Sequence, residues 1–335
     1  MNLQTPTKTL LAILLLVLAT SGQTETKHAG IALYEQGKYP EAIKSLESAV
    51  SKTASDGLLW NYLGLSQLEN GDLKKSIKSL QKAIALDANR TSFRINLGYA
   101  FLRNQQTDKA QNELEKALKI EPNNVQALYL HGVASLWEKK TKDAISNADR
   151  IILIDPKFVD AYILKADALL TGVIGIVADS NDEPDLRDAL RQAISVLNAG
   201  ISTCDKCKQR SKLIEELEAK NAFHEYYSSR GTVQNSAQTA LVENEPGVTP
   251  LKIISKPRAS YTDKARQNNT QGKIKLAVLF GASGRIEYVM FLSRLGSGLD
   301  ENVMRAARSI KFEPKTKDGK PVSVVRVIEY GFSIY

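Results

Sequence analysis

A 34-residue interval recurs through the first half of the chain and constrains its fold more than any other feature. Small and apolar residues return at the same distances in every copy. A repeat of this length is a unit that buries its apolar face only against the next copy, so at least three must stack. The sequence therefore predicts a helical solenoid. The recurring positions are Gly30, Gly64, Gly98 and Gly132, followed by Ala42, Leu46 and Ala49, by Ser76, Leu80 and Ala83, by Ala110, Leu114 and Ala117, and by Ala144, Ala148 and Ile151.

Helix packing explains why these positions stay small. Two antiparallel helices approach closely only where residues such as Gly64 or Ala110 face the partner helix. We therefore expect the repeated glycines to lie against the second helix of their own repeat.

The repeats resemble the tetratricopeptide repeat family. WNYLG at residues 60–64 matches the family's aromatic and Leu-Gly signature, NLG at residues 96–98 matches it in part, and Pro122 and Pro156 stand at its closing position. The resemblance implies a groove that binds a protein partner. By position in the repeat, the groove residues are Asn61, Asn96, Tyr99, Arg103, Tyr129 and Trp137. Alternatively, Tyr129 and Trp137 only pack between helices.

A fifth repeat begins after Pro156, but its second helix is delayed. The strict interval lands on Ala178 and then on two aspartates, which cannot form an apolar stripe. A shift of 11 residues to Ala189, followed by Ala193 and Val196, restores the stripe. We interpret the difference as an insertion.

The insertion is acidic, with Asp179, Asp182, Glu183 and Asp185. A calcium-binding loop would need glycine where Pro184 stands and glutamate where Leu190 stands. The segment is therefore interpreted as a solvated loop. Beyond it, Leu213, Ile214, Leu217 and Phe223 at helical spacing predict a helix that caps the solenoid. Residues 228–250 are polar and aperiodic and are interpreted as a linker.

The N-terminus reads as a targeting segment. Lys8 precedes the apolar run TLLAILLLVLAT, and small residues follow at Ser21 and Gly22. The run is shorter than the ~20 apolar residues of a membrane-spanning helix. We predict a cleaved signal peptide over residues 1–22 and a periplasmic protein. The alternative is an uncleaved inner-membrane anchor that leaves the protein facing the periplasm.

Charge is concentrated in the last quarter of the chain. Residues 251–335 hold 16 Lys and Arg against 7 Asp and Glu, so they carry +9 and residues 1–250 carry −1. A basic exported domain meets acidic protein segments or anionic lipid. No motif of a nucleic-acid module is present.

The sequence offers little for catalysis. Cys204 and Cys207 lie among helical segments without further metal ligands nearby, so a local disulfide is expected and redox activity is the alternative. His131 falls at a helix-packing position, and Gly296 and Gly298 do not form a phosphate loop. We predict no enzymatic activity, no metal site and no cofactor.

The last 85 residues change from helical to alternating patterns. Residues 271–291 alternate on either side of Gly281 and Gly284, as a β-hairpin does. Residues 299–310 carry a helical apolar stripe, and residues 322–335 alternate again. The order predicts a small β-β-α-β domain with one helix on an antiparallel sheet.

This domain resembles the C-terminal domain of TonB, the periplasmic energy transducer of Gram-negative bacteria. The matching residues are Pro257, Tyr261, Ala265, Arg266, Gly272, Gly284, Arg285, Ile286, Leu299, Asp300, Ala306, Ala307, Arg308, Phe312, Pro314 and the run DGKPV at residues 318–322. The resemblance implies that an exposed strand pairs with a short segment of a partner, in TonB an outer-membrane receptor. The corresponding residues are Val322, Val324, Arg326, Ile328, Tyr330 and Phe332, in a strand over residues 322–334. Alternatively, this strand only completes the sheet, with its edge covered by the linker or by a second copy in a homodimer.

Two features depart from TonB. The apolar run of residues 10–19 lacks the family's Ser and His, and the chain has only 10 prolines instead of a long proline-rich spacer. Force transmission is therefore not expected. The sequence predicts tetratricopeptide repeats over residues 23–170, a degenerate repeat and capping helix over 171–227, and the TonB-like domain over 251–335. The predicted function is a periplasmic adaptor for envelope proteins, with an anchored energy transducer as the alternative.

Overall fold

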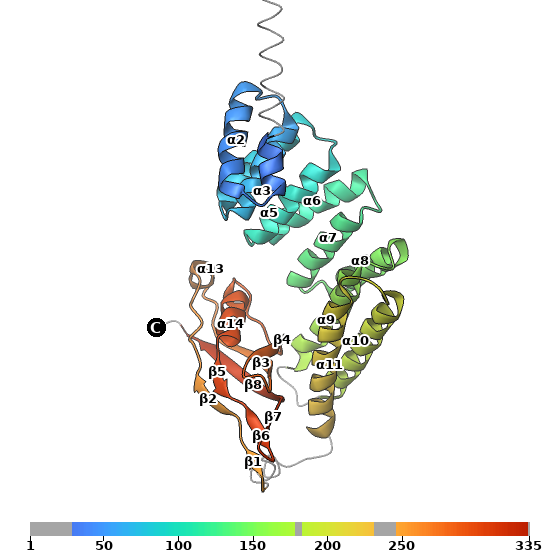
Figure 1. Cartoon of the computed structure of the whole chain (residues 1–335), viewed down its shortest axis with the longest axis vertical. Coiled ribbons are helices and arrows are strands. Elements are labelled where there is room, and N and C mark those ends of the chain that lie inside the picture. Colours follow the sequence, from blue (N-terminus) through green and yellow to red (C-terminus); the bar gives the residue numbers. More distant parts are fainter. Residues whose placement is uncertain (1–28, 178–182, 231–245, 334–335) are drawn as a thin grey trace, which may run out of the picture. The chain divides into compact units, whose positions relative to one another are not determined.

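The computed structural model describes residues 29–177, 183–230 and 246–333 (Figure 1). The chain divides into two compact units, Met1–Glu138 and Lys139–Tyr335, which are treated separately below. The predicted leader and most of the predicted linker lie outside the described residues. Within the described ranges, no helix is both long enough and apolar enough to cross a membrane.

The first unit is a stack of helices in which each helix packs on the next. The first helices of successive repeats, α3, α5 and α7, also contact one another. This is the predicted solenoid. The helices are α2 (Tyr39–Lys52), α3 (Gly57–Glu69), α4 (Leu73–Leu86), α5 (Thr91–Arg103), α6 (Thr107–Ile120) and α7 (Val125–Trp137).

The repeated glycines lie where the sequence places them. A Cβ atom on Gly64 would stand 2.6 Å from Leu80 Cγ, and one on Gly98 would stand 2.7 Å from Leu114 Cγ. Both leucines are fully buried. The 34-residue spacing of glycines therefore records the close approach of the two helices in each repeat.

The turn inside each repeat carries a second 34-residue signal. Gly37, Gly71, Gln105 and Lys139 have φ of 73°, 89°, 57° and 62°. Glycine adopts this left-handed conformation without cost, whereas Gln105 and Lys139 adopt it under mild strain. The backbone path is thus kept even where the glycine is lost.

The second unit begins with four helices, α8 (Thr141–Ile154), α9 (Val159–Val177), α10 (Glu183–Thr203) and α11 (Arg210–Arg230). The shifted stripe is confirmed, because Ala189 and Ala193 are buried. The expectation of a solvated acidic loop is wrong for residues 183–185, because they begin α10. The insertion instead lengthens α9 and α10 to 19 and 21 residues. Asp179 and Asp182 lie outside the described residues.

The C-terminal domain is built on a three-stranded antiparallel sheet in the order β4-β3-β8. Its strands are β3 (Gly272–Phe280), β4 (Ile286–Phe291) and β8 (Val324–Phe332), and α14 (Leu299–Arg308) packs on it. The short helix α13 (Asp263–Gln267) precedes β3. Strand, strand, helix and strand follow in the predicted order.

Short strands extend the domain into a ribbon. β1 (Val248–Thr249) and β7 (Lys320–Val322) flank β6 (Lys315–Lys317), and β2 (Lys252–Ser255) pairs with β5 (Lys311–Glu313). The strand predicted over residues 322–334 is wrong at its start. Ser323 belongs to neither strand, because β7 ends at Val322 and β8 begins at Val324. The Ser323 hydroxyl accepts the N–H of Ala282, so it serves the turn between β3 and β4.

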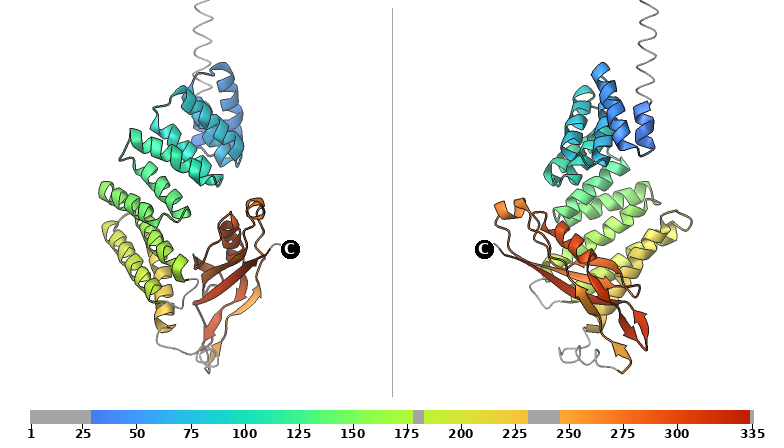
Figure 2. Two further views of the ribbon diagram at one scale, coloured as in Figure 1. Left: turned by 180° about the vertical axis from the view of Figure 1, so that it is seen from behind. Right: turned by 60° about the vertical axis from the view of Figure 1, so that its left-hand side comes forward.

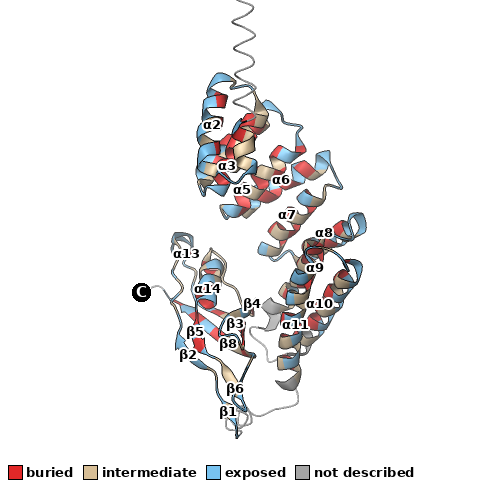
Figure 3. Ribbon diagram, in the orientation of Figure 1, coloured by how far each residue is buried: buried red, intermediate tan, exposed pale blue. Residues whose placement is uncertain are grey.

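The sheet has side chains buried on both faces, and buried residues occur along its strands in Figure 3. Ile274, Leu276 and Ile328 join the core under α14. Ala277, Leu279, Met290 and Val325 point to the opposite face and join a core with α9, α10 and α11. The capping helix α11 therefore covers the second face of the sheet.

A buried lysine joins α9, α11 and β4 within this contact. Lys220 on α11 is fully buried, and its ammonium group binds the Asp167 carboxylate at 3.0 Å and the carboxylate of Glu216. It also donates to the Tyr288 hydroxyl, which in turn donates to Glu216 at 2.8 Å. The Tyr288 ring lies edge-on to Phe223. We call these residues, Lys220, Asp167, Glu216 and Tyr288, the Lys220 cluster.

The Lys220 cluster holds its charges in fixed protonation states. Burial alone would lower the pKa of the Lys220 ammonium, but Asp167, Tyr288 and Glu216 outweigh it and raise that pKa. Burial raises the pKa of the Tyr288 phenol, with Asp167 adding to the effect. Lys220 therefore stays charged and Tyr288 stays neutral at physiological pH. Because neither group changes its charge, the cluster serves to hold α9, α11 and β4 together.

Gly98→Ala tests the helix contact of the third repeat. The added methyl group would meet Leu114, so we expect a loss of about 1–3 kcal/mol in the free energy of unfolding. Gly172→Ala on α9 is the matched control, because its Cβ would stand 3.5 Å from the nearest atom, Thr141 Oγ1. We expect the control to be neutral or to stabilise by up to about 1 kcal/mol. Denaturant titration followed by circular dichroism measures both, and equal effects would contradict the packing argument.

Lys220→Met tests the joint between α11 and β4. Removing the ammonium leaves two carboxylates without their buried partner, so we expect a loss of about 3 kcal/mol in unfolding free energy. Lys212→Met is the matched control on the same helix, because Lys212 pairs with Asp160 at the surface and should contribute less than about 1 kcal/mol. Calorimetry measures the unfolding free energy of each variant. Limited proteolysis at the linker measures how readily the sheet separates from α11. Unchanged stability in Lys220→Met would show that the cluster does not hold the sheet on α11.

Candidate partner-binding surfaces

The predicted groove residues of the solenoid form two polar pairs. The Asn96 side-chain amide donates to Asn61 Oδ1 at 2.8 Å, which links α5 to α3. Arg103 donates to the Tyr99 hydroxyl at 3.1 Å, and Glu69 lies 4.0 Å from the same guanidinium group. The hydrogen bond that Arg103 donates to the Tyr99 hydroxyl raises the pKa of the Arg103 guanidinium. These side chains are therefore ordered before any partner arrives.

The other two aromatic candidates, Tyr129 and Trp137, differ in exposure. Tyr129 is half-buried and packs against the core of α5, α6 and α7. Trp137 is 45% exposed at the end of α7. Only Trp137 therefore offers a large apolar surface to a partner.

Aromatic residues that the sequence reasoning missed lie near the start of the solenoid. Tyr34 packs against Tyr62 with ring centroids 5.5 Å apart, and against Tyr39 at 5.9 Å. Burial, followed by the charge of Glu69, raises the pKa of the Tyr34 phenol. Spacing did not reveal this cluster, because its tyrosines do not recur at the 34-residue interval.

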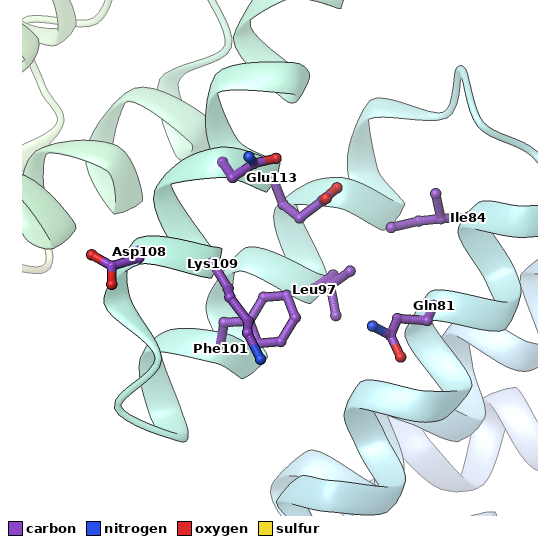
Figure 4. Close-up of a pocket in the computed structure, with 8 residues that line it drawn as sticks. Gln81, Ile84, Leu97, Phe101, Asp108, Lys109 and Glu113 are labelled. Carbon is purple, nitrogen blue, oxygen red and sulfur yellow. The ribbon is translucent and has the colours of Figure 1, made fainter.

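A pocket of about 500 Å³ opens between α4, α5 and α6 (Figure 4). Its apolar floor is formed by Ile84, Leu97 and Phe101, with Lys109 over the Phe101 ring at 5.8 Å. The remaining lining residues are Gln81, Asp108, Asn112 and Glu113. None of the predicted groove residues lines this pocket, so it is a separate surface.

Strand β8 is an edge strand. Within the described part of the chain, β3 is its only strand neighbour. Ile328, Tyr330 and Phe332 point their side chains into the core under α14, so they cannot contact a partner through those side chains. Val324 packs at the border of the same core, Arg326 is half-buried, and Val322 belongs to β7.

The outward backbone groups of β8 belong to the alternate residues. On the neighbouring strand, Lys275 uses its N–H and C=O on the side of β4, so Leu276 faces β8. Leu276 lies opposite Ile328, and alternate residues of a strand direct their backbone groups to opposite edges. Apart from one contact of Lys256, the free ladder within the described residues is therefore Val325, Val327, Glu329 and Gly331, which the sequence pattern did not identify.

One position of this ladder already has a partner. The Lys256 ammonium donates to the Glu329 carbonyl at 3.0 Å and lies over the Tyr330 ring. The Glu329 carboxylate binds Lys273 at 3.1 Å, with Lys275 at 4.0 Å. A lysine at a strand edge protects it against unwanted pairing, and it is a flexible group that a docking strand can displace.

Cys204 and Cys207 lie between α10 and α11, and their sulfur atoms are bonded to each other. Cys204 is buried in the core that α11 shares with the sheet. His131 on α7 is half-buried, with Glu115 at 3.9 Å. Cys204 therefore contributes to the packing of that core.

Family comparisons agree with the two folds. Tetratricopeptide repeat models match residues 29–91 and 67–132, and the family described as Gram-negative bacterial TonB protein C-terminal matches residues 257–334. Tetratricopeptide repeats indicate protein–protein interaction, and both matched families are interaction modules instead of enzymes. The TonB C-terminal domain is periplasmic in bacteria. None of the curated proteins matches the sequence.

Similar solved structures include MamA from Desulfovibrio magneticus, at 17% identity and a TM-score of 0.46 over 54% of this chain and 96% of that one. A thermophilic tetratricopeptide repeat protein of Thermus thermophilus is 13% identical, with a TM-score of 0.44 over 59% of this chain and 98% of that one. A repeat protein from Parabacteroides merdae is 19% identical, with a TM-score of 0.48 over 68% and 81%. The chain therefore carries tetratricopeptide repeats over residues 29–132 and, over residues 257–334, a domain that matches the TonB C-terminal family.

Proposed function

We propose that the protein is a periplasmic adaptor of a Gram-negative bacterium that holds one partner in the repeat groove and docks a second by strand pairing. The observation that carries the proposal is the edge position of β8 in the described residues. An extended segment of an envelope protein, such as an outer-membrane receptor, would add a strand beside β8. No catalytic step is part of this function.

The docking contact would run through the backbone. The free ladder offers the N–H and C=O groups of Val325, Val327, Glu329 and Gly331, since the side chains of alternate residues are committed to the core. Val325 is buried and Val327 is half-buried on the face of α11. Selectivity would therefore come from the shape and charge around the edge, and Lys256 would have to leave the Glu329 carbonyl.

Strand pairing alone would be weak. The four outward residues can make up to about eight hydrogen bonds, and at ~1 kcal/mol each these barely offset a cost of association of about 4–15 kcal/mol. A second contact in the groove would raise the effective concentration of the linked partner. The preordered pairs Asn61–Asn96 and Tyr99–Arg103 support this role, because fewer rotamers would be frozen on binding.

Val327→Pro tests the docking edge. Proline removes the outward N–H and leaves the hydrogen bonds between β8 and β3 in place, because edge strands tolerate proline with its nitrogen outward. We expect the affinity for the β8 partner to fall about tenfold, whereas Val327→Ala, which keeps the N–H, should bind within about twofold. Capture of envelope proteins by the immobilised full chain, with thermal melts of each variant, gives the comparison. If both variants retain the same proteins in equal amounts, β8 is not the docking strand.

Export is tested on the mature protein. For the adaptor we expect a first residue near Gly22 or Gln23, since the apolar run is short for an anchor. Intact-mass spectrometry of the protein purified from its own host measures this. A chain that begins at Met1 and sediments with the inner membrane would support the anchored transducer instead.

A further inference from the structure

A second strand edge of the C-terminal domain lies along β1 and β2. β1 pairs with β6 and β2 with β5, and in the described residues neither has a strand neighbour on its other side. We call this stretch, residues 248–255, the ribbon edge. It belongs to a different part of the domain from β8, so it is an independent surface.

The ribbon edge exposes apolar side chains. All four residues of β2 are exposed, with Ile253 at 40% and Ile254 at 59%. Edge strands are ordinarily protected by charges or bulges, and β2 has Lys252 at its start, paired with Glu313 at 3.3 Å, and a register shift between Ile253 and Ser255. The exposure of two neighbouring isoleucines to water is unfavourable, and a binding partner that covered them would remove this cost.

A face of lysines adjoins the ribbon edge. Lys317 and Lys320 lie directly opposite each other across the β6–β7 hairpin, and Lys315, two residues before Lys317, shares their face. Val248 of β1 lies opposite Lys317, so Val248, Lys317 and Lys320 lie side by side on three neighbouring strands, and the lysines adjoin the ribbon edge. No ion pair links these three lysines to another described residue. Like charges directly opposite each other are unfavourable, so the face is complementary to an anion.

We propose that the ribbon edge binds an extended acidic peptide. Its backbone would pair with β1 and β2, its apolar residues would cover Ile253 and Ile254, and its carboxylates would lie over Lys315, Lys317 and Lys320. The peptide therefore has carboxylates near one end and β-branched or other apolar residues near the other.

The open ladder favours a peptide over a lipid surface. Lysines beside exposed isoleucines also suit anionic headgroups, but unpaired backbone N–H and C=O groups are excluded from hydrocarbon. A peptide satisfies the ladder, the isoleucines and the lysines together. The inference does not depend on β8, because the two edges share no strand.

The test uses the full chain and a fluorescein-labelled probe peptide of three glutamates followed by alternating valine and threonine. Fluorescence anisotropy should show binding that weakens as salt is raised from 50 to 300 mM. A peptide with lysines in place of the glutamates, and one N-methylated at alternate residues to block pairing, should bind at least about tenfold more weakly.

Matched variants locate the site. The double variant Lys317→Glu with Lys320→Glu keeps a like-charge pair but reverses its sign, so affinity for the glutamate probe should fall about tenfold or more. The control Lys75→Glu with Lys82→Glu makes the same change of net charge on exposed positions of α4 and should shift affinity by less than about twofold. Val327→Pro should also leave probe binding unchanged.

Four outcomes would overturn the inference. No saturable binding of the glutamate probe would do so, and so would equal binding of the N-methylated peptide. A loss in Val327→Pro that matches the lysine variant would place the probe on β8, which would leave the proposed function standing and this inference wrong. Lysine-dependent binding to phosphatidylglycerol vesicles without peptide binding would assign the surface to lipid.

Discussion

The sheet β4-β3-β8 packs apolar side chains on both faces, and this double burial decides what the C-terminal domain can present. One face closes on α14 and the other on α11. Side chains of the central strands are therefore committed to cores, and a partner meets backbone groups and peripheral charges. Recognition by an edge follows from this arrangement, since a covered face leaves only the strand borders and the ribbon.

The Lys220 cluster explains why the second face is covered by one particular helix. An apolar contact between α11 and the sheet would tolerate sliding, because dispersion contacts have little directional preference. A buried ammonium that needs Asp167, Glu216 and Tyr288 together permits one register. Replacement of such a cluster by apolar residues often costs nothing in stability, so its value here lies in geometry, and the position of the β4 edge depends on it.

The sequence predicted the solenoid well because its determinants are local and repeated. Gly64 and Leu80 are 16 residues apart, and the same pair recurs as Gly98 and Leu114, so one packing rule appears in copy after copy. The Lys220 cluster had no such signal. Lys220 lies 53 residues from Asp167 and 68 from Tyr288, and in its own helix it looks like one more charge on a solvated face.

The sequence predicted a strand where β8 lies, but the residues that it picked out by alternation are not those whose backbone groups face outward. Alternation at Val324, Ile328 and Tyr330 correctly marks one face, but a face is defined by side chains and an edge by backbone groups. Which residues turn their N–H outward depends on the register with β3, and that register is set by tertiary pairing. The break at Ser323 was hidden for a similar reason, because serine fits an alternating pattern and its role is a hydrogen bond to Ala282, 41 residues away.

The two strand edges of the domain, β8 and the ribbon edge, differ in charge, and would therefore bind peptides of different composition. At β8, Lys256 donates to the Glu329 carbonyl and Lys273 donates to its carboxylate, with Lys275 4.0 Å away, and these contacts offset much of the attraction of the three lysines for another carboxylate. On the β6–β7 hairpin, Lys315, Lys317 and Lys320 have no such acid in the described residues. An acidic peptide would therefore bind more tightly beside the β6–β7 hairpin than at β8. A neutral peptide has no such preference for the hairpin, so it would be better suited to β8 than an acidic one. Two edges with different charge would let one small domain hold two peptides of different composition without competition between them.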